Sequence, residues 1–455
     1  MIRRVLRGSA ASTLQRVVSH PVARDTAGFA AITSLVKAVA FMKEAVVAAA
    51  FGVGTSMDSY LMALVVITFP SAVLVNAAQT VFIREYVRII AVQGESAAAR
   101  FLRGAIVGFL LALTAVMVAW VALLPAILSV VGHGLAPAQR SLVVANVIRL
   151  IPYYYLNGIN LLAYGVLQSR KDFVRSALLP IATPVIVMAL VAAGGADLNV
   201  LMGALTLGTG AETLLLLLRL ARTYLRTAAP PPRAPSPLFD FARGTLIMVP
   251  GTLVSGLTPV IEQTIASGLG HGSISALGYA AKLPATLNTL LTTAVGVTIL
   301  PYFSQRLSLG DWQSCRRFFV RYTKMLALAG VAIALAGVLG SEPFVRFAFQ
   351  RGQFSAQNTL LVTMLQQAYL WQLPGVMVST VAVRYVAAQG RYRALTIGTL
   401  VMVPVTGLLQ WALSELWGAT GLACGTSGGA TLLAAAFFWL ALRRHPEPVR
   451  SPETA

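Results

Sequence analysis

Apolar residues run in long stretches along this chain, and short basic or polar segments separate them. A helix needs about 20 mostly apolar residues to cross the hydrocarbon core of a bilayer, and about twelve stretches have that length. We therefore predict an all-α, polytopic membrane protein. The predicted spans are Phe29–Phe51, Tyr60–Ile83, Gly104–Val131, Leu142–Leu167, Ala177–Ala193, Val200–Leu220, Thr245–Leu269, Ile274–Phe303, Phe318–Leu339, Leu360–Ala388, Ala394–Leu413 and Gly418–Leu442.

A proline-rich segment, Thr227–Pro237, divides these spans into two equal sets. It cannot be helical, because proline lacks the amide donor and fixes its own backbone angle. We expect a basic cytoplasmic or interfacial N-terminal segment (1–27), an N-terminal six-helix lobe (28–221), a cytoplasmic linker (222–243), a C-terminal six-helix lobe (244–442) and a cytoplasmic tail (443–455). The N-terminal segment has no continuous apolar core, so it is not expected to be a cleavable signal peptide.

The two halves repeat one another in sequence. Glu44–Thr55 corresponds to Glu262–Ser273, and both run from a glutamate to Gly-x-Gly and a hydroxyl residue. Six helices per half is an even number, so the two repeats have the same orientation and are related by an axis along the membrane normal. Such parallel repeats are typical of transporters, and we expect two parallel lobes around a central cavity. Further pairs, in the same order, are Tyr164–Arg170 with Tyr385–Arg391 and Ile151-Pro152 with Leu373-Pro374.

Composition and charge agree with this interpretation. Apolar residues make up 57% of the chain and charged residues only 11%, whereas a soluble domain carries about 25% charge. The 35 basic and 15 acidic residues give a net charge of +20, and the excess falls in the loops predicted to be cytoplasmic. Both termini are therefore expected inside, with only Arg140, Arg346 and Arg351 in outer loops. A basic excess distributed in this way does not indicate nucleic acid.

Motifs for catalysis are missing from the sequence. The two cysteines and four histidines have none of the spacings of a zinc site, and no Gly-x4-Gly-Lys-Ser/Thr phosphate loop is present. We therefore expect neither an enzyme nor a nucleotide, metal or other cofactor.

Ionisable side chains within the predicted spans are the candidate functional residues. Each costs about 2.5–3.5 kcal/mol at mid-membrane, so it needs a partner, water or a function. Lys37, Lys43 and Glu44 share the first span, and Lys282 lies in the eighth. Lys43 and Glu44 have two interpretations. Either Lys43 presents a positive charge to a cavity and Glu44 reduces that charge without cancelling it, or the two form a buried ion pair that fixes one helix against another. Lys282 either faces a cavity or extends toward the cytoplasmic surface.

The remaining embedded charges leave alternatives open as well. Arg149 and Arg384 accompany proline-bearing stretches and are interpreted as cavity residues or as interfacial ones. Glu262, the repeat partner of Glu44, is the candidate for coupling to protons or sodium, since a carboxylate in a low dielectric binds protons more readily. Glu212 is interpreted either as a further coupling carboxylate or, in preference, as a contact between packed helices, and Asp58 as an acidic residue of the cavity.

The chain resembles the MurJ/MviN family of lipid-linked oligosaccharide flippases, within the multidrug/oligosaccharidyl-lipid/polysaccharide exporter superfamily. The resemblance implies that an undecaprenyl-pyrophosphate-linked sugar is carried across the bacterial inner membrane through a cationic cavity. By position, Lys43 and Lys282 then hold the pyrophosphate, where the family usually has arginines. The family's paired arginines of the second span are replaced by Leu74 and Val75, and an acidic residue by Ala285. The resemblance rests on Phe41–Gly52, Asp58–Ala63, Tyr279–Leu283, Gly296–Pro301, Phe349–Phe354 and Arg384–Gly390.

Two functions follow from these features. The leading hypothesis is a flippase for lipid II or for an exopolysaccharide or capsule repeat unit, working by alternating access and driven by membrane potential, H+ or Na+. The residues assigned to the substrate are Lys43, Lys282, Arg384, Arg149 and Lys37. The alternative is a cation-coupled exporter of drugs or metabolites that uses Glu44, Asp58 and Glu262. The sequence leaves the oligomeric state open, with a monomer as one option. Phe344–Phe354 is predicted to form a short interfacial helix on the outer face.

Overall fold

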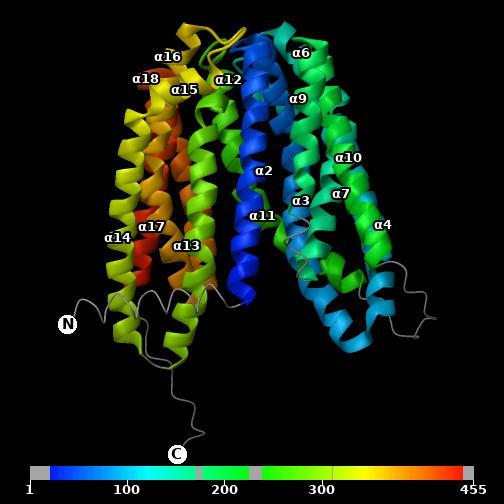
Figure 1. Cartoon of the computed structure of the whole chain (residues 1–455), viewed down its shortest axis with the longest axis vertical. Coiled ribbons are helices and arrows are strands. Elements are labelled where there is room, and N and C mark those ends of the chain that lie inside the picture. Colours follow the sequence, from blue (N-terminus) through cyan, green and yellow to red (C-terminus); the bar gives the residue numbers. More distant parts are fainter. Residues whose placement is uncertain (1–20, 171–176, 225–237, 310, 444–455) are drawn as a thin grey trace, which may run out of the picture. The chain divides into compact units, whose positions relative to one another are not determined.

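The computed structural model describes residues 21–170, 177–224, 238–309 and 311–443, and every regular element in these ranges is a helix (Figure 1). The predicted N-terminal segment up to residue 20, the proline-rich linker from 225 to 237 and the tail from 444 lie outside the described residues. Helix α2 begins at Pro21, within the segment expected to be cytoplasmic or interfacial, and the boundary of that segment stays a prediction.

The first half of the chain forms α2 (Pro21–Phe51), α3 (Thr55–Gln93), α4 (Glu95–Ala122), α5 (Leu124–Val131), α6 (Pro137–Arg149), α7 (Ile151–Ser169), η1 (Leu179–Ile181), α9 (Ala182–Gly194) and α10 (Leu198–Tyr224). The second half forms α11 (Leu238–Ser267), α12 (Ser273–Ala280), α13 (Lys282–Ser308), α14 (Trp312–Leu339), α15 (Ser341–Phe349), α16 (Ala356–Leu370), α17 (Gln372–Ala388) and α18 (Tyr392–Leu442).

Each predicted span coincides with one helix or with two consecutive helices, which confirms the all-α membrane fold. Among the described residues, six helices are each long and apolar enough to cross a membrane, and α6 with α7 adds a seventh as a pair bent by 50°. The last two predicted spans form α18, which is kinked at Trp417 and Gly418. The predicted interfacial helix at Phe344–Phe354 is displaced, because α15 covers Ser341–Phe349.

At least four predicted spans are interrupted where a second helix begins with a proline in its first turn, and one of these helices is α5, which carries Pro125. Pro152, Pro284 and Pro374 lie close to the starts of α7, α13 and α17. Proline is tolerated there because the first-turn amides of a helix have no acceptor within the helix. The breaks at Leu150 and Trp371 belong to the repeated Ile151-Pro152 and Leu373-Pro374 pairs, so the sequence repeat is also a repeat of helix breaks.

The glycine turns of the repeat also correspond. Gly52 follows α2 with φ of 61°, and Gly270 follows α11 with φ of 98°. Both values lie in the left-handed region that glycine adopts without steric cost. The next helices begin at the equivalent Thr55 and Ser273.

The chain divides into two compact units. Unit 1 is Met1–Val130, Leu135–Gly256 and Arg351–Phe354, and unit 2 is Val131–Gly134, Leu257–Gln350 and Ser355–Ala455. Within unit 1, α3 packs against α4, α6 and α7, and α10 packs against α7 and α9. Within unit 2, α17 packs against α13, α14 and α18. The expected lobe boundary after residue 243 stays a prediction, because the division between the compact units falls at Gly256, inside α11.

An aromatic cluster forms the core of unit 2. The rings of Phe319 and Tyr385 stack with their centroids 4.5 Å apart, and Phe303 meets Tyr385 edge-on at 5.0 Å. These three side chains come from α14, α17 and α13, and they are almost fully buried. The cluster therefore holds the three helices together at one level.

Candidate functional site

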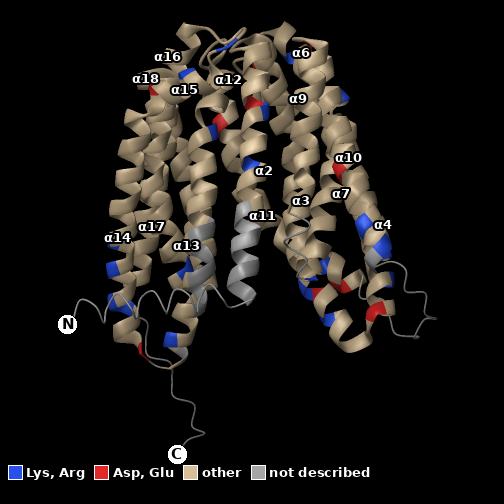
Figure 2. Ribbon diagram, in the orientation of Figure 1, with Lys and Arg blue, Asp and Glu red and all other residues tan. Residues whose placement is uncertain are grey.

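Two adjacent charged residues of α2 form an ion pair within the membrane-spanning part of unit 1. Lys43 Nζ lies 2.6 Å from Glu44 Oε1, and the two side chains are 22% and 16% exposed. Because neighbouring helical residues point in different directions, the flexible lysine side chain closes the pair. Glu44 therefore balances the charge of Lys43, and the amine keeps part of its surface open to an anion. Figure 2 colours basic and acidic positions on α2.

The other candidates of unit 1 lie at other positions of α2 and on α3 and α6. Lys37 is exposed on α2, two turns before Lys43. Asp58 is only 2% exposed and begins the long helix α3. Arg149 is exposed and ends α6, where the negative end of the helix dipole favours a cation.

A polar cluster in unit 2 surrounds Glu262 of α11. The Tyr369 hydroxyl of α16 donates a short hydrogen bond to Glu262 Oε1. Thr426 of α18 also bonds the Tyr369 side chain, and Gln410 Nε2 donates to Thr426 Oγ1 at 2.9 Å. This polar cluster thus offers carboxylate, hydroxyl and amide oxygens from three helices.

Two candidate cations of unit 2 lie elsewhere in the fold. Lys282 is partly buried and begins α13, immediately after the break at Ala281. Arg384 is exposed on α17. Because of this break, Lys282 is the first residue of a helix and not a residue in the middle of a continuous one.

Glu212 forms contacts between packed helices. Its carboxylate accepts hydrogen bonds of 2.7 Å from the Tyr164 hydroxyl of α7 and 2.7 Å from the Thr183 hydroxyl of α9. Glu212 is buried in α10, so the three side chains join three helices of unit 1. These contacts agree with the packing interpretation.

Sequence reasoning missed the partners of several charges. Arg170 binds the Glu95 carboxylate through both terminal nitrogens at 2.5 Å and donates to the Tyr86 hydroxyl at 2.9 Å. Its repeat partner Arg391 donates to the Leu440 carbonyl at 2.8 Å. Both arginines end the repeated motif that runs from a tyrosine to an arginine, so the sequence singled them out. Their acceptors lie far away in sequence and follow no spacing rule.

Within the parts of the chain that the structure describes, no three His, Cys, Asp or Glu side chains gather as a metal site requires. The polar side chains described above bind one another or the backbone, and none forms a nucleophile–base pair. The arrangement is suited to binding charged groups within an apolar protein.

Comparison with known proteins gives a consistent result at the sequence level. A family model described as "Lipid II flippase MurJ" matches residues 47–451. A probable lipid II flippase MurJ from Synechocystis is 24% identical over 92% of this chain and 81% of its own length. A second one, from Rhizobium meliloti, is 25% identical over 73% of this chain and 64% of its own length.

Solved structures share the fold. A lipid II flippase MurJ in an inward closed conformation superposes with a TM-score of 0.75 at 18% identity, over 90% of this chain and 87% of that one. An inward-facing multidrug resistance transporter of the MATE family and MOP superfamily gives 0.66 at 11% identity, over 90% and 93%. At these identities the structural likeness concerns the fold alone.

Proposed function

This chain belongs to the MurJ family, whose model matches most of its length, and on that premise we propose that it is a flippase for a lipid-linked oligosaccharide. Its substrate carries a pyrophosphate between a polyprenyl tail and a sugar, and lipid II, which gives the curated relatives their name, is the first candidate. The family match carries the proposal. Transport from the cytoplasmic to the outer leaflet of the bacterial inner membrane, by alternating access, would supply peptidoglycan synthesis.

We assign the pyrophosphate to Lys43 and Lys282. An anionic headgroup crossing an apolar medium needs positive groups at close range, because isolated charge is poorly solvated there. Glu44 supports this role by balancing Lys43 when no substrate is bound. Lys282 supports it through its place at a helix break, where it begins α13. Arg149, Arg384 and Lys37 are assigned to the same anionic substrate as supporting cations.

The driving force is proposed to be the membrane potential, with Glu262 binding a coupling H+ or Na+. Each charge that crosses the full potential contributes about 2.3 kcal/mol per 100 mV. The oxygen-rich surroundings of Glu262 support the coupling role, because hydroxyl and carboxylate oxygens suit a small hard cation. Transport by the Glu262→Gln variant should then no longer respond to the ion gradient.

The decisive experiment is complementation of a strain depleted of its own lipid II flippase. Lys43→Ala and Lys282→Ala should each abolish growth at unchanged expression, whereas Lys43→Arg should retain it. Arg393→Ala, at an exposed position near the start of α18, is the control. Full activity of both lysine variants would reject the pyrophosphate assignment. Failure of the unaltered chain to complement, with transport of an undecaprenyl-linked exopolysaccharide unit in vesicles, would move the substrate to that class.

A cation-coupled exporter of drugs or metabolites remains the second candidate. It is favoured by the fold shared with the MATE transporter and by the acidic residues Glu44, Asp58 and Glu262. Cationic drugs require an acidic cavity, whereas the embedded side chains assigned above are mostly basic. Increased sensitivity of a deletion strain to cationic drugs, with normal cell-wall synthesis, would support the exporter and reject the flippase.

A further inference from the structure

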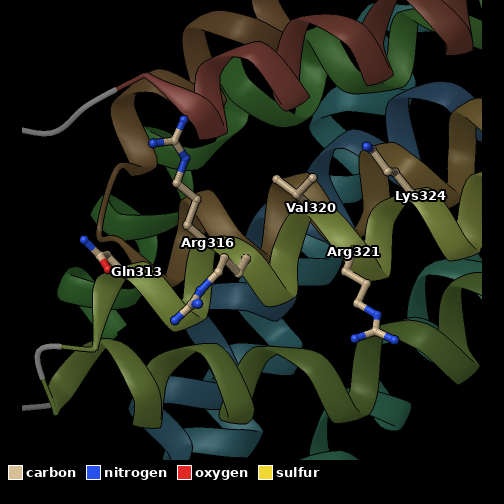
Figure 3. A pocket seen from close by; sticks show the side chains of 6 residues that line it. Gln313, Arg316, Val320, Arg321 and Lys324 are labelled. Atoms are coloured by element: carbon tan, nitrogen blue, oxygen red, sulfur yellow. The ribbon is translucent and has the colours of Figure 1, made fainter.

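The first turns of α14 carry a concentrated basic surface. Six residues line an open hollow of about 670 Å³, and Figure 3 shows the five labelled ones along this single helix. Four of the six are cations, and all four are exposed. In Figure 2 the rest of α14 is uncharged. We call these residues the α14 basic hollow: Gln313, Arg316, Arg317, Val320, Arg321 and Lys324.

The cations of the α14 basic hollow have no carboxylate partner among the described residues. Arg317 Nη2 donates to Ser314 Oγ at 3.3 Å, which leaves its charge unbalanced. The acidic residue before the helix, Asp311, is bound to Arg306 at 3.0 Å. Hydrogen bonds from Ser314 and this arginine hold the pKa of Asp311 below its ordinary value, so the carboxylate is ionised and already engaged.

The same face of α14 continues as an apolar surface. Arg317, Arg321 and Lys324 are followed by Leu328, four residues after Lys324, and by Leu335, seven residues further on, all within about 40° of one line along the helix. Leu328 is 72% exposed and Leu335 45%. The opposite face, with Cys315, Phe319, Leu326 and Ala334, is buried against the rest of unit 2. One exposed helix face is therefore cationic at one end and apolar for the remainder.

Aromatic rings lie at the level of the basic residues of α14. Phe318 lies 4.4 Å from the Tyr302 ring and stacks on Tyr322 at 5.3 Å. Aromatic side chains of this kind are enriched where the hydrocarbon core meets the headgroups. The basic end of α14 thus lies at a membrane interface, which the charge distribution predicts to be the cytoplasmic one.

The depth of the α14 cations in the bilayer determines whether they require an anionic partner. A 28-residue helix is about 42 Å long, and the hydrocarbon core is about 30 Å thick. With Leu339 at the outer edge of that core, Arg321 falls about 3 Å and Lys324 about 7–8 Å inside its inner edge. Cations at this depth are stabilised by an anion located at the level of the headgroups.

We propose that the α14 basic hollow binds the phosphate headgroup of an anionic membrane phospholipid, whose acyl chains pack along Leu328 and Leu335. The hollow supplies four cations to a phosphate. The planar guanidinium group of arginine can donate two parallel hydrogen bonds to phosphate oxygens. The apolar continuation matches the acyl chains that follow a headgroup into the bilayer. This site is separate from Lys43 and Lys282, and it does not depend on the assignment of the transported substrate.

The test uses the full chain in nanodiscs with a photoactivatable phosphatidylglycerol, whose cross-links are mapped by mass spectrometry. The cross-links should concentrate between Arg317 and Leu335. Photoactivatable phosphatidylcholine should label this stretch much less. In Arg321→Gln/Lys324→Gln, affinity for phosphatidylglycerol should fall about 20- to 30-fold, since each cation near the surface is worth about 1 kcal/mol. The single variant Arg321→Lys should keep most of the binding.

The matched control is Arg84→Gln/Arg306→Gln, which removes two exposed cations that already pair with carboxylates at 3.0 Å. It should bind phosphatidylglycerol as the unaltered chain does. Equal losses in the two double variants, or equal labelling by both lipids, would overturn the proposal. Displacement of the photolipid by a polyprenyl pyrophosphate at equal concentration would overturn it as well, in favour of a docking site for the transported substrate.

Discussion

At the scale of single residues, two backbone carbonyls near prolines or helix breaks are bound by side chains distant in sequence. Pro70 lies inside α3 and has no amide to donate, so the carbonyl of Val66, four residues earlier, loses its helical partner. Trp120 Nε1 of α4 donates to that carbonyl at 3.0 Å. Near the break after α16, the hydroxyl of Ser427 similarly donates to the Ala368 carbonyl at 2.6 Å. Side chains thus replace missing backbone donors where no water is available.

Replacing Trp120 by phenylalanine should destabilise the protein by about 1–3 kcal/mol, because the Val66 carbonyl is left buried without a donor. Thermal unfolding in detergent, followed by fluorescence, measures the loss. Trp411→Phe changes an exposed tryptophan and should have little effect. In a Pro70→Ala background, where residue 70 regains its amide, Trp120→Phe should cost less. An equal cost in both backgrounds would contradict the assigned role.

The Glu262–Tyr369 hydrogen bond should be measurable as a coupling energy. Tyr369→Phe removes the only donor on that side chain and should cost about 1.5–3 kcal/mol, the range for bonds to charged groups. A double-mutant cycle with Glu262→Gln should give a coupling of about 0.5–3 kcal/mol in unfolding free energy. Strictly additive effects would show that the two side chains do not stabilise each other.

At the scale of elements, the segment Arg351–Phe354 is held against the end of α2 within unit 1. The Gln353 amide donates to the Ala49 carbonyl at 2.8 Å. A Cβ on Gly52 would lie 2.5 Å from the Gln353 carbonyl oxygen, and one on Gly352 would lie 2.2 Å from the Ala49 carbonyl oxygen. The glycines of two separate sequence motifs are therefore required by one close backbone contact.

Gly52→Ala should destabilise the protein by about 1–3 kcal/mol, because its positive φ and the neighbouring carbonyl both exclude a side chain. Gly54→Ala is the matched control, since φ is 171° and no atom lies within 4 Å of the added Cβ. Melting temperatures of the two variants check the difference. Similar melting temperatures would mean that Arg351–Phe354 does not constrain the turn.

At the scale of the whole molecule, the distribution of basic residues predicts the orientation in the membrane. Loops at one set of helix ends carry most of the arginines, and these loops are expected in the cytoplasm. The loop that contains Ala196 is expected outside, and the end of α3 at Gln93 inside.

Cysteines introduced one at a time at these positions test the orientation. In spheroplasts, a membrane-impermeant maleimide should label Ala196→Cys and leave Gln93→Cys unlabelled until the membrane is opened. Both positions are exposed. The unaltered chain, whose Cys315 is buried and Cys424 partly buried, gives the background labelling. The reverse labelling pattern would reverse the predicted topology.

The twelve apolar stretches show which features of the fold can be predicted from the length of a hydrophobic stretch alone. Burial in lipid requires only a sufficient run of apolar residues, so the existence and approximate bounds of the spans followed from sequence. Whether each span forms one unbroken helix could not be predicted from the sequence. Pro70 lies inside an unbroken helix because Trp120 supplies the missing donor, whereas the α6–α7 pair near Pro152 bends by 50°. Both are prolines in predicted spans, and the difference comes from packed neighbours.

For the candidate charged residues too, some contacts could be predicted from the sequence and others only from the structure. Lys43 and Glu44 are adjacent, so their ion pair was among the sequence interpretations. The Tyr369 partner of Glu262 lies 107 residues away, and only the packing of α11 against α16 brings the two together. By itself, the sequence determined the membrane fold, the repeat and the ionisable residues, because these depend on local composition and spacing. Tertiary structure alone decided the helix breaks and the hydrogen-bond partners, because they depend on which distant side chain reaches an unsatisfied group.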